Sequence, residues 1–523
     1  MTDKMYVART ALIVALGGFL MGFDASVISG VVKFIEIEFS LSSLELGWAV
    51  SSLTLTATLA MMVSGPLSDA VGRRTVLYGA AVLYAVSAIG SALAPTYTML
   101  VAARMIGGIG VGASLIIAPM YIAEIAPPAM RGQMVSFNQL NIVFGISVAF
   151  FTNYLILQLG QLEAAWAQSL MFGPHNWRWM LGLETLPAVL YFFCLFAVPE
   201  SPRWLVMNGQ SDAGLAIMTK ANGAEAAQHD LEEVHKSLAA DANKEKARLT
   251  ALFAPALRLV LLIGIVIAVV QQITGINAVF FYAPMIFEQS GIGTNAAFMQ
   301  AVLVGLVNLA FTVVAILLID RLGRRPLLIT GLAGVAITMT VLAYGFWSAS
   351  YTLEPDAMDT LPDDVAAVLM PLAGETFDSD LAFKEAVRNT AGPVMAQQYQ
   401  SEIITSAIEM NSLLILFGIL TFVASFAVSV GPVMWVLFSE LFPNRVRGIA
   451  ISFVGLINSA VSWAVQQFFP WELANLGNAL TFLLYGAFAV LGLAFVITRV
   501  PETKGKSLEE LESFLSHHKK TRT

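Results

Sequence analysis

The sequence predicts an all-α integral membrane protein, with twelve transmembrane helices in two six-helix bundles and short intracellular helices between them. Three observations support this fold class. The chain of 523 residues is 57% apolar and only 12% charged, whereas soluble domains contain about 25% charged residues. Its apolar residues fall into runs near the length of about 20 residues that one membrane crossing needs. A charged motif also occurs twice, which indicates two repeated halves.

The repeated motif ends in two arginines and lies between two apolar runs in each half. It reads Asp-Ala-Val-Gly-Arg-Arg at residues 69–74 and Asp-Arg-Leu-Gly-Arg-Arg at residues 320–325. In both copies the aspartate precedes the first arginine of the pair by four residues, and glycine precedes it by one. Because such charges are costly in hydrocarbon, we expect residues 65–74 and the second copy to be tight loops in water.

A second marker agrees with the duplication. Glu124 lies seven residues before Arg131, and Glu440 lies seven residues before Arg447. The second half is longer between its markers because it contains an insert, residues 348–410, with no counterpart in the first half. The insert carries a net charge of −9, whereas the whole chain carries −8, so the rest of the chain is nearly neutral at +1. We expect it to be a loop with some helix, and the sequence assigns it no role.

The apolar runs and the repeats together predict the organisation of the chain. The expected spans are residues 9–32, 47–68, 75–94, 98–122, 133–157, 178–198, 257–288, 297–319, 326–347, 411–438, 448–469 and 475–498. The expected parts are an N-terminal bundle (residues 1–198), an intracellular helical linker (199–256), a C-terminal bundle (257–499) whose extracytoplasmic insert (348–410) lies between spans 9 and 10, and a cytoplasmic tail (500–523).

The positions of the arginines predict the orientation. Nine of them fall on one side together with both termini, and an excess of arginine marks the cytoplasmic side. These nine are Arg73, Arg74, Arg131, Arg203, Arg321, Arg324, Arg325, Arg445 and Arg447. We therefore expect a multi-pass protein of the cell membrane, in a bacterium the inner membrane, that functions as a monomer in the lipid bilayer. Nothing in the sequence suggests nucleic acid as a partner, and the single cysteine, Cys194, excludes an intrachain disulfide.

Asp24 and Arg104 are charged residues inside otherwise apolar spans. If the first span starts near Arg9, Asp24 lies roughly 8 Å below the outer surface, and Arg104 lies about 9 Å below it in the fourth span. Each charge alone costs about 2.5–3.5 kcal/mol or more in lipid, so we expect the two to face inward and pair. The alternatives are that Arg104 extends to the outer interface and that Asp24 is a purely structural polar group.

A buried carboxylate beside a guanidinium is suited to proton coupling, since its proton affinity responds both to burial and to the neighbouring charge. The equivalent positions of the second half are Gly275 and Leu420. The coupling pair is therefore expected in the first half alone.

Neutral amides and one tryptophan form the other polar group inside the spans. Span 7 is too long for one straight helix and is interrupted at Thr274-Gly275, and a helix-breaking Gly431-Pro432 occurs in span 10. Amides in hydrocarbon either line a cavity or join helices together. Amides beside an aromatic ring suit a small neutral sugar or polyol. The residues concerned are Gln139, Gln271, Gln272, Asn277, Asn308, Trp435 and Asn458.

These residues and motifs resemble the sugar porter family of the major facilitator superfamily, and within it the bacterial proton–sugar symporters most, because Asp24 is kept. The resemblance covers nearly the whole chain outside the insert. It is carried by Gly22-Phe-Asp24 with Ile28-Ser-Gly30, the two arginine motifs, Arg104 with the glycines between 107 and 112, Glu124 with Arg131-Gly132, the Pro-Glu-Ser-Pro-Arg-Trp run at 199–204, the Gln-Gln-Ile-Thr-Gly-Ile-Asn run at 271–277, and the Pro-Glu-Thr-Lys-Gly run at 501–505.

The resemblance implies that the amides and Trp435 bind the hydroxyls and ring of a sugar. It also implies that charged residues on the cytoplasmic side latch the two bundles together. The sequence departs from the family at Phe281, where a tyrosine is usual, and at Ser459, where a tryptophan often follows the amide. The implied latch residues are Asp69, Arg73, Arg74, Glu124, Arg131, Glu200, Arg203, Asp320, Arg324, Arg325, Glu440 and Arg447.

The leading functional hypothesis is a secondary active transporter that imports a monosaccharide, a hexose or pentose, or a similar polyol together with a proton by alternating access. No cofactor is expected, and the proton is the coupling ion. The alternatives are a proton-independent facilitator and a non-transporting sugar sensor, although the tail and the linker are short for a signalling domain. An enzyme is not expected, because the few ionisable residues in the spans form no nucleophile–base pair or metal cluster.

Overall fold

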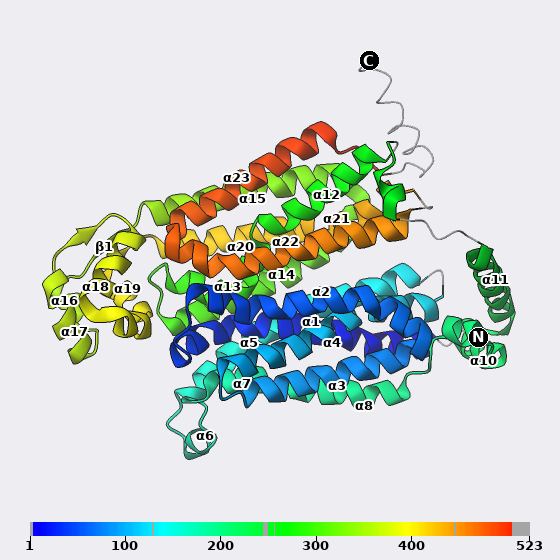
Figure 1. Ribbon diagram of the computed structural model, residues 1–523, viewed down its shortest axis with the longest axis horizontal. Helices are drawn as coiled ribbons and strands as arrows, with labels where there is room; N and C mark the ends of the chain where they lie inside the picture. The colour runs from blue at the N-terminus through cyan, green and yellow to red at the C-terminus, as the bar shows by residue number, and fades with distance from the viewer. Residues whose placement is uncertain (1–3, 128–129, 244–248, 256, 444–445, 505–523) are drawn as a thin grey trace. The chain divides into compact units, whose positions relative to one another are not determined.

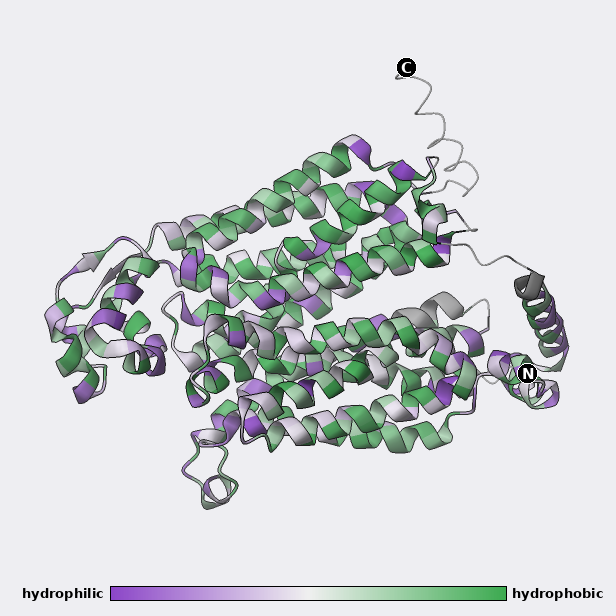
Figure 2. Ribbon diagram, viewed as in Figure 1, coloured by the Kyte–Doolittle hydropathy of each residue, from purple (hydrophilic) through white to green (hydrophobic). Residues whose placement is uncertain are grey.

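The computed structural model describes residues 4–127, 130–243, 249–255, 257–443 and 446–504 (Figure 1). Within these residues, twelve helices are long and apolar enough to cross a membrane, which confirms the twelve predicted spans. Apolar residues run along these helices in Figure 2. The spans are formed by α1 (Lys4–Glu38), α2 (Ser43–Val71), α3 (Arg73–Ala92), α4 (Tyr97–Ile125), α5 (Arg131–Gly160), α7 (Asn176–Gly182) with α8 (Thr185–Cys194), α12 (Arg258–Ile273) with α13 (Ile276–Glu288), α14 (Thr294–Leu322), α15 (Arg324–Trp347), α20 (Ser412–Val428) with α21 (Val430–Leu441), α22 (Arg447–Asn475) and α23 (Gly477–Arg499).

The chain forms two compact units. The first contains Met1–Ile28, Ser52–Thr152 and Glu163–Lys246, and the second contains Ser29–Ser51, Asn153–Leu162 and Ala247–Thr523. The helices α1, α2 and α5 are thus each divided, with one part in either unit. The predicted boundaries of the two bundles remain a prediction.

The core of the first unit is formed by apolar side chains of α1, α3, α4 and α8, among them Leu20, Tyr84 and Tyr121. Two glycines allow α1 and α5 to approach each other closely. A Cβ atom on Gly22 would collide with the backbone of Ile142, and one on Gly145 would collide with the backbone of Phe19. The close backbone contact fixes the part of α1 that carries Asp24 against α5 within the unit.

The core of the second unit is built from apolar residues of α12, α15, α21 and α22. Two of its spans are discontinuous. Gly275 adopts a left-handed conformation with φ of 91° between α12 and α13, which confirms the predicted interruption of span 7. Span 10 breaks at Ser429, shortly before Gly431 and Pro432. Each break leaves backbone groups without helical partners, so polar side chains nearby can bond to them.

The prediction that residues 65–74 form a loop was wrong. Helix α2 continues through this segment to Val71, and Gly72, with φ of 99°, is the only residue between α2 and α3. In the second copy, Gly323 with φ of 92° separates α14 from α15 in the same way. The physical reason is length: a helix of 29 residues is about 43 Å long. It therefore extends beyond a hydrocarbon core of about 30 Å, and its charged end can remain helical in water.

The linker between the halves is helical. It contains α9 (Pro202–Met207), α10 (Ser211–Asn222), α11 (Ala224–Asn243) and the 3₁₀ helix η2 (Leu249–Phe253). Apolar side chains of α9, α10 and α11, such as Val206, Met218 and Ala227, pack into a small cluster. The three helices therefore form one packed group, and hydrophilic residues cover much of α10 and α11 in Figure 2.

The acidic insert is a folded subdomain, which corrects the expectation of a loop with some helix. Its three short strands pair in the order β2-β1-β3. Its apolar side chains form their own core, in which the rings of Tyr351 and Phe383 stack at 5.2 Å. The elements are β1 (Ser350–Thr352), α16 (Pro355–Met358), α17 (Asp363–Leu369), η3 (Met370–Leu372), β2 (Thr376–Phe377), α18 (Asp380–Gln398), α19 (Gln400–Ala407) and β3 (Ile408–Glu409).

Candidate functional site

Asp24 and Arg104 form a buried ion pair in the first unit, between α1 and α4. Arg104 Nη1 donates to Asp24 Oδ1 at 3.3 Å, and each side chain is only 2% exposed. The predicted pairing of these two residues is confirmed. Two opposite charges at the same depth satisfy each other, and a variant that removes either residue would remove this buried ion pair.

The second oxygen of Asp24 has a different environment. Asp24 Oδ2 accepts no hydrogen bond from the described residues. It lies against α4 at Gly107, where an added Cβ would be 2.9 Å from this oxygen and would collide with Ser87. Glycine at position 107 therefore leaves room for the carboxylate, whose Oδ2 is available to hold a proton.

Glu184 is a third ionisable residue at this site, and the sequence analysis missed it. It lies between α7 and α8, is 2% exposed, and interacts electrostatically with both Asp24 and Arg104. The hydroxyls of Tyr84 and Tyr191 are buried in the same unit. The signal was present, because Glu184 lies inside the predicted span 178–198, where the cost argument used for Asp24 applies equally.

The predicted amides of the second unit form one hydrogen-bonded network. Gln272 Nε2 donates to Gln271 Oε1 at 3.1 Å and to Asn458 Oδ1 at 3.2 Å. Asn458 Nδ2 donates to Gln271 Oε1 at 2.6 Å, and Asn277 Nδ2 donates to Gln272 Oε1 at 2.7 Å. The network therefore joins α12, α13 and α22 through side chains that each carry both a donor and an acceptor.

The breaks in the helices supply further partners to this network. Gln271 Nε2 donates to the carbonyl of Gly431, next to the discontinuity of span 10, at 3.4 Å. Ser462, which the sequence analysis missed, accepts from Asn277 at 2.6 Å and from Gln466 at 2.8 Å. The sequence could have indicated Ser462, because it lies four residues, about one helical turn, after Asn458 and so on the same face of α22.

The other three predicted sugar-binding residues lie outside the network among the described residues. Trp435 on α21 is 48% exposed, and its ring is close to Gly455 on α22. Asn308 is buried on α14. Gln139 belongs to the first unit and is exposed on α5. An exposed indole near an amide network offers a flat apolar face beside donors and acceptors.

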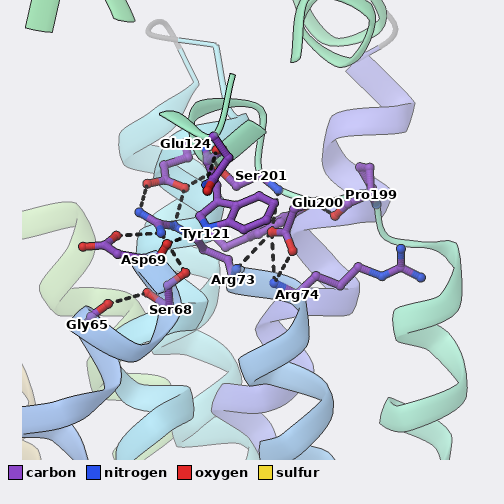
Figure 3. A network of polar contacts seen from close by, with 12 residues as sticks. Gly65, Ser68, Asp69, Arg73, Arg74, Tyr121, Glu124, Pro199, Glu200 and Ser201 are labelled. Atoms are coloured by element: carbon purple, nitrogen blue, oxygen red, sulfur yellow. Dashed lines mark hydrogen bonds and ion pairs between the residues drawn. The ribbon is translucent and has the colours of Figure 1, made fainter. Parts of the chain in front are cut away.

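A charged cluster lies where α2 meets α3 in the first unit (Figure 3). Arg73 donates through Nε and Nη2 to the two carboxylate oxygens of Glu124, at 3.2 Å each. Arg73 Nη1 lies 2.7 Å from Asp69 Oδ1. Glu124 also accepts from the hydroxyl of Ser201, which precedes α9. The guanidinium thus joins α2, α3 and α4, and the linker contacts the same carboxylate.

Glu200 caps α3 in this cluster. Its carboxylate accepts from the backbone N–H groups of Arg73, at 3.0 Å, and of Arg74, at 3.1 Å. A negative charge at a helix N-terminus satisfies free N–H groups and interacts favourably with the helix dipole. A Cβ on Gly72 would collide with this carboxylate. The Arg74 side chain points away from Asp69 in Figure 3 and donates to Tyr78 Oη at 2.8 Å.

The second unit contains a cluster of the same design. Arg324 donates through Nε and Nη2 to Glu440 Oε1, at 3.1 and 2.7 Å. Glu502 accepts from the N–H groups of Arg324 and Arg325, both at 3.1 Å. Thr503 Oγ1 donates to Glu440 Oε2 at 2.6 Å. Glu502 and Thr503, which take the parts of Glu200 and Ser201, were missed as members of this cluster, although the repeat Pro-Glu-Ser/Thr was visible at 199–201 and 501–503.

The remaining predicted latch residues have other positions. Arg203 donates to Ser237 Oγ at 3.3 Å and so joins α9 to α11. Arg447 donates to the carbonyl of Phe442 at 3.0 Å. The side chains of Arg131 and Asp320 lie outside the described residues.

Comparison with known proteins identifies the family. The sugar (and other) transporter family matches residues 10–358 and 391–515, which is most of the chain. The chain belongs to the sugar transporter family. This confirms the resemblance seen in the sequence and the prediction of a transporter rather than an enzyme. With its twelve apolar helices, this sugar transporter family member is a multi-pass membrane protein.

Individual relatives within the family are similar over almost their whole length. The arabinose-proton symporter of Bacillus subtilis (strain 168) is 36% identical over 97% of this chain and 94% of that protein. The D-xylose-proton symporter of Escherichia coli (strain K12) is 34% identical over 98% of this chain and 96% of that protein. A solved structure, the partially occluded inward open conformation of the xylose transporter XylE from E. coli, has a TM-score of 0.72 at 31% identity and covers 96% of this chain and 100% of that one. These matches confirm the predicted major facilitator fold.

Proposed function

We propose that this protein imports a monosaccharide, a pentose or hexose, together with a proton by alternating access. The observation that carries the proposal is the buried pair of Asp24 and Arg104, 3.3 Å apart, between two membrane-spanning helices. The names of the relatives, an arabinose-proton and a D-xylose-proton symporter, support the same substrate class and coupling ion. The bacterial inner membrane, cytoplasmic termini and a monomeric state complete the proposal.

Asp24 is the proposed proton carrier. While it is ionised, it is attracted to Arg104, and the two charges hold α1 and α4 together. Protonation at Oδ2 removes the negative charge and weakens this attraction, so the two helices can change their packing. The proton leaves Asp24 when the site faces the cytoplasm, and the original pair forms again.

The amide network is the proposed sugar site. Gln271, Gln272 and Asn458 bond to one another without a ligand, and each can exchange such a bond for one to a sugar hydroxyl. Because amides offer donors and acceptors together, they match hydroxyl groups, which also do both. Trp435 supplies a flat face for the sugar ring, and Gln139 and Asn308 are proposed as further contacts.

The coupling proposal is tested with Asp24→Asn in proteoliposomes. The amide carries no exchangeable proton of this kind, so we expect sugar exchange across the membrane at equilibrium and no accumulation against a gradient. Wild-type vesicles should accumulate labelled D-xylose or L-arabinose when a proton gradient is imposed, and sugar should make the medium more alkaline. Asp212→Asn, at an exposed position on α10, is the matched control and should behave like the wild type.

Two outcomes contradict parts of this proposal. Accumulation of sugar by Asp24→Asn would show that Asp24 is not the coupling residue. Wild-type protein that exchanges sugar but never accumulates it would make the protein a facilitator, with Asp24 as a structural group.

A further inference from the structure

The last turns of α1 belong to the second unit, although the rest of this helix belongs to the first. Lys33 holds this end of the helix. Its Nζ donates to Glu288 Oε1 at 3.1 Å and to Thr294 Oγ1 at 2.6 Å. Glu288 is the last residue of α13 and Thr294 the first of α14. The side chain of Glu288 is 9% exposed, so this ion pair is largely shielded from water.

The folded insert holds the same end of α1 at a second point. Gln397, near the end of α18, donates through Nε2 to Glu36 Oε1 at 3.3 Å and to the carbonyl of Leu41 at 3.1 Å. Helix α1 ends in a turn in which Ser40 has a φ of 50° and the N–H of Leu41 donates to the carbonyl of Glu36 at 3.0 Å. Gln397 therefore contacts both sides of the turn that terminates α1.

The insert is itself anchored at the other end of α18. Asp380 accepts from the backbone N–H of Asn478 at 3.2 Å, at the start of α23, and from Lys384 at 3.2 Å. Between these two ends, α18 packs through Phe383 and Val387 against the core of the insert. Helix α18 is kinked at Gly392, which has a φ of 78°, so the anchor at Asp380 and the contact at Gln397 lie on two helical segments of the insert. Through these two contacts, the insert connects α23 to the end of α1.

We propose that Lys33, Glu36, Glu288, Thr294 and Gln397 form an external clamp on α1, and that release of this clamp admits sugar from the outer side. The inference rests on the proposed alternating-access function and gives the insert a role in it. A buried ion pair contributes little net stability, because its attraction is offset by lost hydration. Polar contacts of this kind therefore leave the clamped and released states close in free energy, as a carrier that must visit both requires.

The clamp and the coupling residue lie on the same helix. Asp24 and Lys33 are nine residues apart, about 13.5 Å along the axis of α1, and α1 is unbroken between them. Protonation of Asp24 loosens α1 from α4, and release of Lys33 and Glu36 frees its outer end. Both events act on the same continuous helix. A full movement of α1 therefore requires protonation of Asp24 as well as release of Lys33 and Glu36.

The test measures the distance between spin labels at Leu44 and Asp359, two exposed positions beside the α1 turn and on the insert. Both are introduced as cysteines in full-length protein in nanodiscs, with Cys194→Ser to remove the native thiol. In Lys33→Met and in Gln397→Ala, we expect the population at longer distance to rise at least threefold over wild type. Gln398→Ala, the exposed neighbour on the same helix, is the matched control and should leave the distribution unchanged.

Unchanged distributions in both variants would overturn the clamp. Should Lys33→Met fail to fold, Gln397→Ala alone carries the test, because it removes an amide and no charge. Exchange of labelled D-xylose is measured on the same samples. Distances that change in a protein that moves no sugar would contradict the proposed function, and with it the admission of sugar, and would support only the contacts that hold the end of α1. Sugar exchange with unchanged distances would contradict the clamp alone.

Discussion

The charged clusters of the two units are built from equivalent residues but differ in burial. In each, an arginine at the start of a helix bonds to a glutamate on the next span. A second glutamate, in the chain that follows the last span of the half, caps the same helix. Arg73 and Glu124 are 5% and 10% exposed, whereas Arg324 and Glu440 are 12% and 25% exposed. The charges of the first cluster are therefore less accessible to water, and their stabilisation depends more on the ion pair between Arg73 and Glu124.

The difference arises from what covers each cluster. In the first unit, the helical linker follows Ser201, and Trp204 on α9 donates to the carbonyl of Asp69 at 2.9 Å. In the second unit, the chain after Thr503 supplies Lys504, whose Nζ donates to the carbonyl of Arg321 at 2.6 Å. A packed helix with an indole excludes water better than a single flexible lysine. The bonds of Arg73 to Glu124 should thus contribute more to the free energy of unfolding than the similar bonds of Arg324 to Glu440.

The largest expected effect separates the two arginines. Arg73→Met leaves Glu124 buried without its partner, a loss of about 3–5 kcal/mol, and Arg324→Met should cost about 1–3 kcal/mol because Glu440 can still reach water. Thermal unfolding of the purified variants in detergent, followed by tryptophan fluorescence, measures both. We expect the fall in Tm for Arg73→Met to be at least twice that for Arg324→Met. Arg258→Met, at an exposed position, is the control, and equal falls for the two variants would refute the comparison.

The second effect should be equal in the two units. Glu200 accepts from the N–H groups of Arg73, Arg74 and Ser201, and Glu502 accepts from those of Arg324, Arg325 and Lys504. Each alanine variant removes the cap of one helix, so each should cost about 0.5–2 kcal/mol. The same unfolding measurement should show falls in Tm that agree within error, with Glu385→Ala on the insert as control. A much larger fall for Glu200→Ala would mean that burial governs the caps as well.

The smallest effect has no counterpart in the second unit. Trp204→Phe keeps an aromatic ring and removes one hydrogen bond to the carbonyl of Asp69, which is worth about 0.5–1.5 kcal/mol. Combined with Arg73→Met, the loss should be less than additive, because both changes open the same cluster to water. Trp166→Phe, on an exposed ring, controls for the lost fluorescence. Strict additivity in the double variant would show that Trp204 does not shield Arg73.

The sequence predicted the fold and part of the site for identifiable reasons. Asp24 and Arg104 could be paired because each is a costly charge and the helical rise gives its depth. The same cost argument would have found Glu184, had it been applied to every acid in a span. The amides could be grouped, but the order of their bonds depends on the breaks at Gly275 and Ser429, which set the directions of the half-helices.

One local feature was predicted wrongly. The turn at Gly72 was expected to be a loop because charge was assumed to end a helix, whereas the length of the helix decides where the charge lies.

Other features depend on contacts between distant segments and could not be predicted. The core of the insert could not be predicted, because its apolar residues, such as Tyr351 and Phe383, are spread over several short elements. The bond from Gln397 to Glu36 joins residues 361 positions apart, and no periodic pattern signals it.

The capping glutamates also impose an order on biosynthesis. Arg73 is translated 127 residues before Glu200, and Arg324 is translated 178 residues before Glu502, because the insert lies in between. At about 5–20 residues per second, the ribosome supplies the first cap after roughly 6–25 s and the second after roughly 9–36 s. The first half can therefore mature at the translocon while the second is still being made. The N-terminus of α15, at Arg324 and Arg325, therefore remains without its capping glutamate for longer than that of α3. The second half should be open to proteolysis during this longer interval.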